Sequence, residues 1–269
     1  MKLFEFFKSN GESIPHEINR NKPCVTFNRE ELISVYNLMS TVSGCNTMKS
    51  KEEMLAATSL IDYLDLLHHS DVQKDWDSLK ALFYLFTKTE PSAKILDAGG
   101  GIHSPVLNAL SSYGYENLYA CDIVDVNSTP ERFSNKIKFS IQSIENTNYP
   151  DRFFNAVTCL SVIEHGVDHR NFFAEMSRIM EKEGLLIITA DYWPDYVDCT
   201  GIFPYGPNNP EMKVYQAGEI EELVQMGKEF GFQLCSPLML HSDEKAVRWD
   251  DVDREYTFIF LAMVKVLNI

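Results

Sequence analysis

An apolar run leads into three consecutive glycines between residues 94 and 104, and this segment constrains the fold more than any other. The run reaches Asp97, and Gly99, Gly100 and Gly101 precede a stretch with helical periodicity. Glycine lets the backbone approach a ligand closely, and a helix that follows presents N–H groups without partners in the helix. The segment therefore predicts a buried strand, a ligand-binding turn and a helix, in that order.

The spacing of the glycines argues against a dinucleotide as the ligand. The dinucleotide motif G-x-G-x-x-G, read from Gly99, requires a glycine at position 104, where this chain has Ser104. Asp97 would also face a pyrophosphate, whereas a carboxylate at this place suits a ligand with an ammonium or sulfonium charge. Asp122, 21 residues after Gly101, closes a second apolar run and predicts hydrogen bonds to two ribose hydroxyls.

Short apolar runs alternate with helical patterns from residue 94 onward, which predicts a mostly parallel sheet covered by helices on both faces. The last two strands lack a helical pattern between them and predict an antiparallel hairpin. The expected strands cover 94–97, 117–122, 137–142, 156–160, 185–189, 232–237 and 256–266, with helices near 104–114, 168–182 and 217–230.

Residues 1–90 carry mainly helical signals. Asn28 and Glu31 form a candidate capping box before one helix, apolar spacing predicts a second over 51–69, and a third runs from Trp76 to near Glu90.

The motifs taken together resemble the class I S-adenosylmethionine-dependent methyltransferases. The family's first motif matches Asp97, Gly99 and Gly101, and its ribose-binding acid matches Asp122. The resemblance covers about residues 93 to 190 and continues through Gln142–Glu145, Phe153–Val157, Ser161–His165 and Arg178–Gly184. It implies an α/β, Rossmann-like, mostly parallel sheet with an antiparallel last strand. It also implies that the protein is a methyltransferase with S-adenosyl-L-methionine as cofactor.

The resemblance further implies a set of cofactor-binding residues. They are Asp97, Gly99, Gly100, Gly101, Asp122, Ile123, Gln142, Ser143, Ile144 and Leu160, with Ile123 lying against adenine. The chain departs from the family at three places: His103 replaces the third glycine, Asn155 replaces the usual Asp, and Gln142 replaces the acid on the adenine side.

Three residues are candidates for catalysis because they follow predicted strands or the glycines. His165 and His103 are candidate general bases, since an unperturbed imidazole titrates near pH 6.5. Asp191, directly after an apolar strand, is a candidate for holding a substrate hydroxyl or amine. The alternatives are local packing for the histidines and capping of a loop for Asp191.

A long segment rich in aromatic and acidic residues covers about residues 191–216 and has neither helix nor strand periodicity. Long loops of this kind are often functional, so we expect a substrate lid with Tyr192, Trp193, Tyr196 and Tyr205 as its walls, although a surface loop held by its own aromatic residues remains the alternative. Residues 1–90 are then an N-terminal helical cap that shapes the substrate site, and 91–269 form the methyltransferase core.

The composition limits the classes of partner that we expect for this protein. The chain of 269 residues carries a formal net charge of −15, which repels nucleic acid and anionic membranes. We expect a small-molecule methyl acceptor that reacts at O, N or C by SN2 displacement, no nucleic-acid or membrane partner, and no metal. The oligomeric state is left open, with a homodimer among the alternatives.

The N-terminal sequence has no signal-peptide pattern, and the six cysteines are scattered without a C-x-x-C pair. We therefore expect a reducing, cytoplasmic setting, with Cys121 and Cys159 as buried thiols. Two other functions stay open at this point: an NAD(P)-dependent oxidoreductase on a Rossmann fold, and a non-catalytic protein that binds S-adenosylmethionine.

Overall fold

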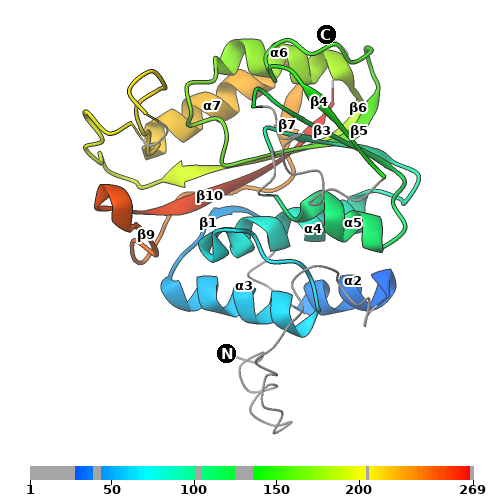
Figure 1. Ribbon diagram of the computed structural model, residues 1–269, viewed down its shortest axis with the longest axis horizontal. Coiled ribbons are helices and arrows are strands. Elements are labelled where there is room, and N and C mark those ends of the chain that lie inside the picture. Colours follow the sequence, from blue (N-terminus) through cyan, green and yellow to red (C-terminus); the bar gives the residue numbers. More distant parts are fainter. Residues whose placement is uncertain (1–27, 39–43, 101–103, 125–135, 204–205, 267–269) are drawn as a thin grey trace, which may run out of the picture.

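The computed structural model (Figure 1) describes residues 28–38, 44–100, 104–124, 136–203 and 206–266. Its central sheet has the strand order β4-β3-β2-β5-β6-β10-β1-β8, with β7 and β9 also paired to β10. The strands are β1 (Cys45–Thr47), β2 (Lys94–Ala98), β3 (Asn117–Asp122), β4 (Ile137–Ile141), β5 (Phe154–Leu160), β6 (Met180–Tyr192), β7 (Phe232–Leu234), β8 (Leu238–Met239), β9 (Val247–Trp249) and β10 (Arg254–Lys265).

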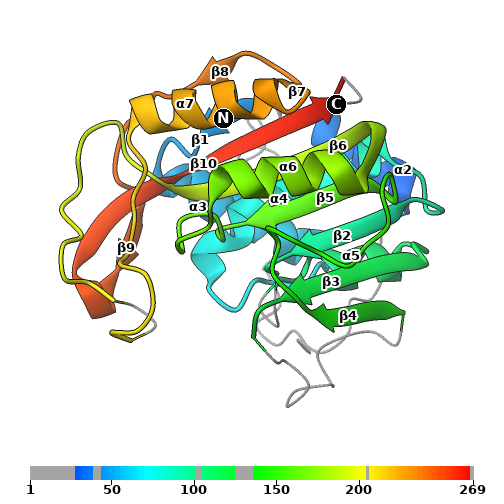
Figure 2. The same cartoon turned by 90° about the horizontal axis from the view of Figure 1, so that it is seen from above.

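Strands β4, β3, β2, β5 and β6 run parallel, and β10 lies antiparallel beside β6 (Figure 2). Strand β7 pairs antiparallel with the end of β10, which confirms the predicted antiparallel pairing. The two strands do not form a simple hairpin, because β8, β9 and η3 lie between them in the chain. The mostly parallel sheet with an antiparallel last strand is therefore confirmed. Since parallel strands direct their carboxyl ends to one edge, the loops after β2, β3, β5 and β6 meet there.

Helices cover both faces of this sheet. Helices α6 and α7 lie on one face and α4 and α5 on the other, with α3 outside α4 (Figure 1). The helices are α2 (Arg29–Leu38), α3 (Lys51–Tyr63), α4 (Asp75–Lys88), α5 (Val106–Ser112), α6 (His169–Ile179) and α7 (Ala217–Glu229), with short 3₁₀ turns η1 (Val72–Lys74) and η3 (Asp250–Val252).

Local signals explain where helices begin and end. Asn28 and Glu31 exchange side-chain and backbone hydrogen bonds at 2.8 and 3.0 Å, which confirms the capping box before α2. The second helix is shorter than predicted and ends at Tyr63, because Asp65 takes a left-handed conformation with φ +52°. The apolar spacing continues to Leu67, and this misled the prediction.

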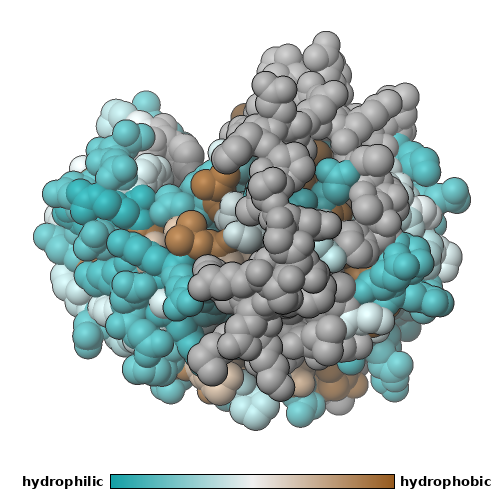
Figure 3. Space-filling view, turned by 90° about the horizontal axis from the view of Figure 1, so that it is seen from below, coloured by the Kyte–Doolittle hydropathy of each residue, from teal (hydrophilic) through white to brown (hydrophobic). Residues whose placement is uncertain are grey.

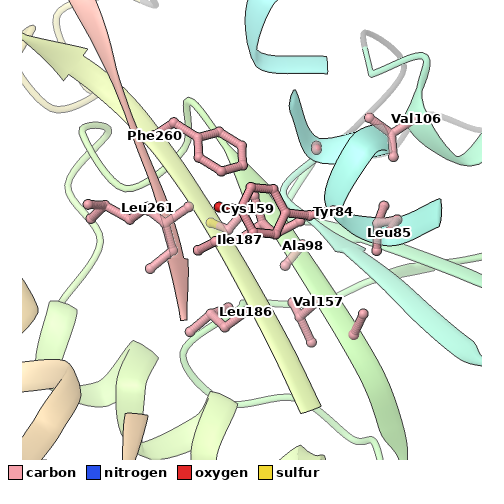
Figure 4. Packing of buried hydrophobic residues seen from close by; sticks show 14 of the residues in the cluster. Tyr84, Leu85, Ala98, Val106, Val157, Cys159, Leu186, Ile187, Phe260 and Leu261 are labelled. Atoms are coloured by element: carbon pink, nitrogen blue, oxygen red, sulfur yellow. The ribbon is translucent and has the colours of Figure 1, made fainter. Parts of the chain in front are cut away.

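The hydrophobic core extends over both faces of the sheet, and Figure 4 shows the part of it near α4 and α5. The ring of Tyr84 on α4 stacks on Phe260 of β10, with centroids 5.4 Å apart. Strand β1 was not predicted, because three residues carry too little periodicity; it pairs with β10. Part of the region before residue 90 is thus built into the sheet, and its division from the core as a separate cap stays a prediction.

The coloured residues on the face seen in Figure 3 are mostly hydrophilic, with smaller hydrophobic areas between them. In the part of the chain that the structure describes, no helix is both long enough and apolar enough to cross a membrane. Cys121 and Cys159 are buried free thiols, as predicted.

Candidate active site

The glycine turn after β2 can be built only with glycine at its first two positions. Gly99 has φ +77°, and a Cβ there would lie 2.5 Å from Cγ1 of Val162. A Cβ on Gly100 would lie 2.2 Å from Oδ2 of Asp97. The amide of Gly99 also donates a 2.8 Å hydrogen bond to the carbonyl of Cys121 in β3. The turn is therefore packed closely between β3, the loop after β5 and a carboxylate.

Asp97 supports this turn from within the protein. Its buried Oδ1 accepts a 2.7 Å hydrogen bond from Oγ1 of Thr158 on β5. Burial raises the pKa of Asp97, while hydrogen bonds from Ser104 and Thr158 lower it in part. The carboxylate thus fixes the end of β2, and its contact with a ligand stays a prediction. The candidates Gly101 and His103 lie outside the described residues.

The end of β3 presents a carboxylate next to exposed apolar side chains. Oδ1 of Asp122 accepts a 2.9 Å hydrogen bond from the amide of Val124, and the carbonyl of Asp122 accepts one from the amide of Gln142. Ile123 is 75% exposed and Val124 is 62% exposed. Such apolar exposure beside a carboxylate fits a nucleoside, whose ribose needs hydrogen-bond acceptors and whose base needs an apolar surface.

The remaining cofactor candidates lie at the same edge with differing exposure. Gln142 is held by Ser140 and by the amide of Asn148, and Ser143 is exposed. Ile144 is buried, and Leu160 at the end of β5 is half-buried. The residues present therefore fit a nucleoside cofactor along the ends of β2, β3 and β4.

Three buried carboxylates, Asp77, Glu164 and Asp191, gather beside this turn; we call them the acid cluster. Asp77 lies in the first turn of α4, Glu164 in the loop after β5, and Asp191 near the end of β6. Oε1 of Glu164 accepts a 3.3 Å hydrogen bond from the amide of Asp191. Oδ2 of Asp77 accepts hydrogen bonds from Ser161 at 3.2 Å and Thr189 at 2.9 Å.

Each acid of the cluster keeps one buried oxygen without a hydrogen-bond partner: Oδ1 of Asp77, Oε2 of Glu164 and Oδ1 of Asp191. Burial raises the pKa of Asp77 and of Glu164 to about 7, and it raises that of Asp191 as well. The positive charge of Lys74 opposes all three shifts, and the Tyr256 hydroxyl hydrogen-bonds Asp191. Near neutral pH the cluster therefore holds protons that isolated carboxylates would release.

His165 lies in the same loop as Glu164, but burial shifts its pKa in the opposite direction. Burial, together with the charge of Lys74, lowers the pKa of His165 to about 4. Its imidazole is therefore neutral at physiological pH and accepts a proton weakly, which favours the acid cluster over His165 as the proton-accepting part of the site. A catalytic role for His165 stays a prediction.

The segment 191–216 is anchored over the loop after β5. The amide of Tyr215 donates to the carbonyl of Asp191 at 2.9 Å, and the Tyr215 hydroxyl donates to the carbonyl of Ile163 at 3.0 Å. A Cβ on Gly166 would lie 2.4 Å from Cγ of Pro210. The segment therefore crosses the carboxyl edge of the sheet close to the acid cluster.

The four aromatic candidates of this segment differ in position. Tyr192 is buried and its hydroxyl donates to the carbonyl of Leu240 at 2.8 Å, so it packs in the core. Trp193 is half-buried, and Tyr196 is 67% exposed. Tyr205 lies outside the described residues. Trp193 and Tyr196 are the side chains that stay accessible to a substrate.

Asp77, Lys74 and Tyr256 belong to this site, although no sequence pattern indicated them. Acidic residues in the first turn of a helix are common because they favour the helix dipole, so Asp77 carried no distinctive signal. Tyr256 belongs to a strand pattern and reaches Asp191 only through the pairing of β10 with β6. Within the described ranges, no group of three or more His, Cys, Asp or Glu side chains is arranged to hold a metal ion.

Comparisons with known proteins agree with this geometry. A family model described as a methyltransferase domain matches residues 68–236. Similar solved structures include the [4+2]-cyclase SpnF, which is 15% identical with a TM-score of 0.55 over 84% of this chain and 100% of that chain. Haemonchus contortus phosphoethanolamine N-methyltransferase 2, in complex with S-adenosyl-L-methionine, is 14% identical with a TM-score of 0.51 over 81% of this chain and 58% of that chain.

Geranyl diphosphate methyltransferase, in complex with GPP and sinefungin, is 12% identical with a TM-score of 0.51 over 80% of this chain and 82% of that chain. At such identities these structures establish the fold alone, and no curated protein matches the sequence. The sheet order and the glycine turn define the class I methyltransferase fold. Because the family model covers more than half of the chain, the chain belongs to the methyltransferase domain family, and its cofactor is S-adenosyl-L-methionine.

Proposed function

We propose that this enzyme transfers the methyl group of S-adenosyl-L-methionine to a small-molecule acceptor at the carboxyl ends of β5 and β6. One observation carries the proposal. Val162 packs against Gly99 of the cofactor turn, and Glu164, two residues later, accepts a hydrogen bond from Asp191. A single short loop thus joins the cofactor turn to the acid cluster, where an acceptor would lie next to the methyl group.

Different residues of the chain would bind different parts of the cofactor. Asp122 would accept hydrogen bonds from the ribose hydroxyls, and Ile123 would pack against the adenine. Gly99 and Gly100 leave the backbone open to the ligand. When bound, S-adenosyl-L-methionine supplies a methyl group on a positively charged sulfur, which suits in-line (SN2) displacement by O, N or C. The protein mainly has to align the acceptor and take up its proton.

Two features support a small acceptor over a macromolecule. The segment 191–216 is tied across the loop after β5 by Tyr215 and Pro210, which restricts the room above the site. The net charge of −15 disfavours a polyanion such as RNA. Trp193 and Tyr196 offer aromatic surface for the acceptor, and such surface also favours a cationic group.

Labelled methyl transfer tests this function. The purified enzyme is incubated with methyl-labelled S-adenosyl-L-methionine and, separately, with the low-molecular-weight, RNA and protein fractions of a cell extract. We expect label in the low-molecular-weight fraction only, and calorimetric binding of both the cofactor and its demethylated product. Label in RNA or protein, or the absence of cofactor binding, would overturn the proposal.

A further inference from the structure

We infer that the acceptor is an amine, and that the free oxygens of Asp77, Glu164 and Asp191 receive its N–H groups before the nitrogen is methylated. This inference rests on the proposed function and names the substrate class of the same site. It depends on the unpartnered oxygens of the acid cluster and on their place beside the cofactor turn.

Unpartnered buried carboxylate oxygens are costly, because a buried polar group without a hydrogen bond loses its interaction with water and gains nothing in return. Here three such oxygens belong to acids that act on one another: Glu164 is hydrogen-bonded to the Asp191 amide, and Asp77 acts electrostatically on both. A ligand with several N–H donors would satisfy them together. This is the second observation, beyond the gathering of acids, that indicates a ligand.

The charge balance favours a cation over a neutral donor. Three acids face the positive charge of Lys74, and Asp71 adds a further negative charge toward Asp191. Tyr256 contributes a neutral hydroxyl, and His165 contributes a neutral imidazole. Above about pH 7, where Asp77 and Glu164 ionise, a positively charged ligand would therefore find an excess of negative charge at the end of β6.

The number of donors separates an amine from the other nucleophiles. A primary ammonium offers three N–H donors, whereas a hydroxyl or a thiol offers one. An amine with several N–H donors can therefore satisfy more of the unpartnered oxygens of the acid cluster than an alcohol with one donor can. A site built for several N–H donors rejects a ligand that lacks them, because its own polar groups are then left unpaired.

The same acids can accept the proton that an ammonium group must lose before its nitrogen is methylated. An ammonium has no lone pair, so it first gives one proton to a carboxylate of the Glu164–Asp191 pair, which becomes a carboxylic acid. The amine lone pair then forms the N–C bond as the S–C bond breaks and its electron pair stays on sulfur. The product is a methylated ammonium, and the carboxylic acid releases its proton to solvent. Atoms and charge balance, and no oxidant or reductant is needed.

The test compares probes that share one carbon skeleton, 2-phenylethylamine and 2-phenylethanol, beside butylamine and butanol. Binding to the enzyme saturated with S-adenosylhomocysteine is measured by calorimetry at pH 7, near the raised pKa of Asp77 and Glu164, in two buffers of different ionisation enthalpy. We expect each amine to bind at least 10-fold more tightly than its alcohol, with release of protons that the acid cluster holds. Equal binding of the pairs, or failure of both amines to bind, would overturn the inference.

Variants test whether the acid cluster causes the preference for amines over alcohols. Asp191→Asn and Glu164→Gln keep the shape of the side chains, and we expect each to reduce the preference for amines at least 10-fold while binding S-adenosylhomocysteine normally. Glu181→Gln is the matched control, because Glu181 is exposed at the opposite end of the same strand, β6. An unchanged preference in both cluster variants would contradict the inference.

The two proposals fail differently. Normal cofactor binding and labelling of small molecules without a preference for amines would overturn the inference and leave methyl transfer intact. Absence of cofactor binding would instead remove the proposed function. Binding of S-adenosylhomocysteine by each variant also shows that the variant is folded.

Discussion

The amide of Asp191, near the end of β6, donates a hydrogen bond of 3.3 Å to Oε1 of Glu164 in the loop after β5. This contact brings two carboxyl groups together that are 27 residues apart in the chain. Burial raises the pKa of both, and each carboxyl group retains an oxygen without a partner. The loop that carries Glu164 also packs Val162 on Gly99, so this loop connects the glycine turn to the acid cluster.

Asp122→Ala is expected to weaken the binding of S-adenosyl-L-methionine by about 1–3 kcal/mol, the scale of hydrogen bonds to a charged group. Calorimetric titration measures the change. Glu116→Gln is the control, because Glu116 is exposed and precedes the other end of β3. An unchanged affinity in Asp122→Ala would remove Asp122 from the cofactor site.

Gly99→Ala is expected to lower the free energy of unfolding by about 1–3 kcal/mol, since φ +77° is strained for alanine and its Cβ would meet Val162. Gly218→Ala is the matched control: Gly218 lies in α7 with no atom within 4 Å of an added Cβ. This change should stabilise by up to about 1 kcal/mol. Urea denaturation distinguishes the two, and equal effects would argue against the close packing of the turn.

Asp77→Asn is expected to stabilise the protein at pH 8. Burial raises the pKa of Asp77 to about 7 from its ordinary 3.8, so the folded state binds more protons than the unfolded state between these values. Stability contributed by this group therefore falls as the pH rises from about 4 to 7. Asn carries no charge, so the free energy of unfolding at pH 8 should rise by roughly 1–3 kcal/mol. This net figure allows for weaker hydrogen bonds from Ser161 and Thr189.

The gain from Asp77→Asn should disappear near pH 4, where the carboxyl is protonated in the folded protein. Urea denaturation at both pH values measures it. The expected sign would be wrong if Asp77→Asn destabilised the protein, and did so more strongly at pH 8 than at pH 4.

His68→Gln is expected to destabilise the protein at low pH more than at high pH. Nδ1 of His68 lies 2.8 Å from Oδ2 of buried Asp75, and Nε2 lies 2.8 Å from Oδ1 of Asp62. The hydrogen bond with Asp75 is the largest cause that raises the pKa of His68 above 6.5. The stabilisation is therefore complete below pH 6.5 and is lost as the pH rises through the raised pKa.

We expect a loss of about 1–3 kcal/mol for His68→Gln at pH 6, and a smaller loss at pH 9, from urea denaturation. His241→Gln provides the comparison, because His241 and Asp243 form an exposed pair whose loss should cost less than about 1 kcal/mol. A penalty for His68→Gln that grows with pH would show that the charged imidazole is not the stabilising form.

Trp193→Ala and Tyr196→Ala are expected to raise the KM of the acceptor by about 10-fold or more, because binding energy from the aromatic surface of the segment 191–216 would be lost. The Kd of S-adenosyl-L-methionine should change little. Steady-state kinetics and calorimetry measure the two quantities. Similar changes in both would indicate that the segment supports the fold and does not contact the acceptor.

Much of the fold could be predicted from local patterns. The order of the longer strands and helices after residue 94 follows from apolar periodicity, and the glycine turn follows from three adjacent glycines between a strand and a helix. The short strands β8 and β9 were not predicted, and the helix expected over 168–182 ends at Ile179, where β6 begins. Strand β1 escaped because three residues carry no periodicity, and the end of α3 escaped because Leu67 continues the helical spacing beyond the left-handed Asp65. Strand length and helix ends depend on packing that a local window does not contain.

The sequence by itself determined the parallel sheet, the glycine turn and the acid at the end of β3, because each depends on neighbours within a few residues. Only the tertiary structure decided the acid cluster. Asp77, Glu164 and Asp191 come from α4, the loop after β5 and β6, and they meet because α4 packs against the sheet at its carboxyl edge. Their raised pKa values and unpartnered oxygens are products of burial, and burial depends on contacts between segments far apart in the chain.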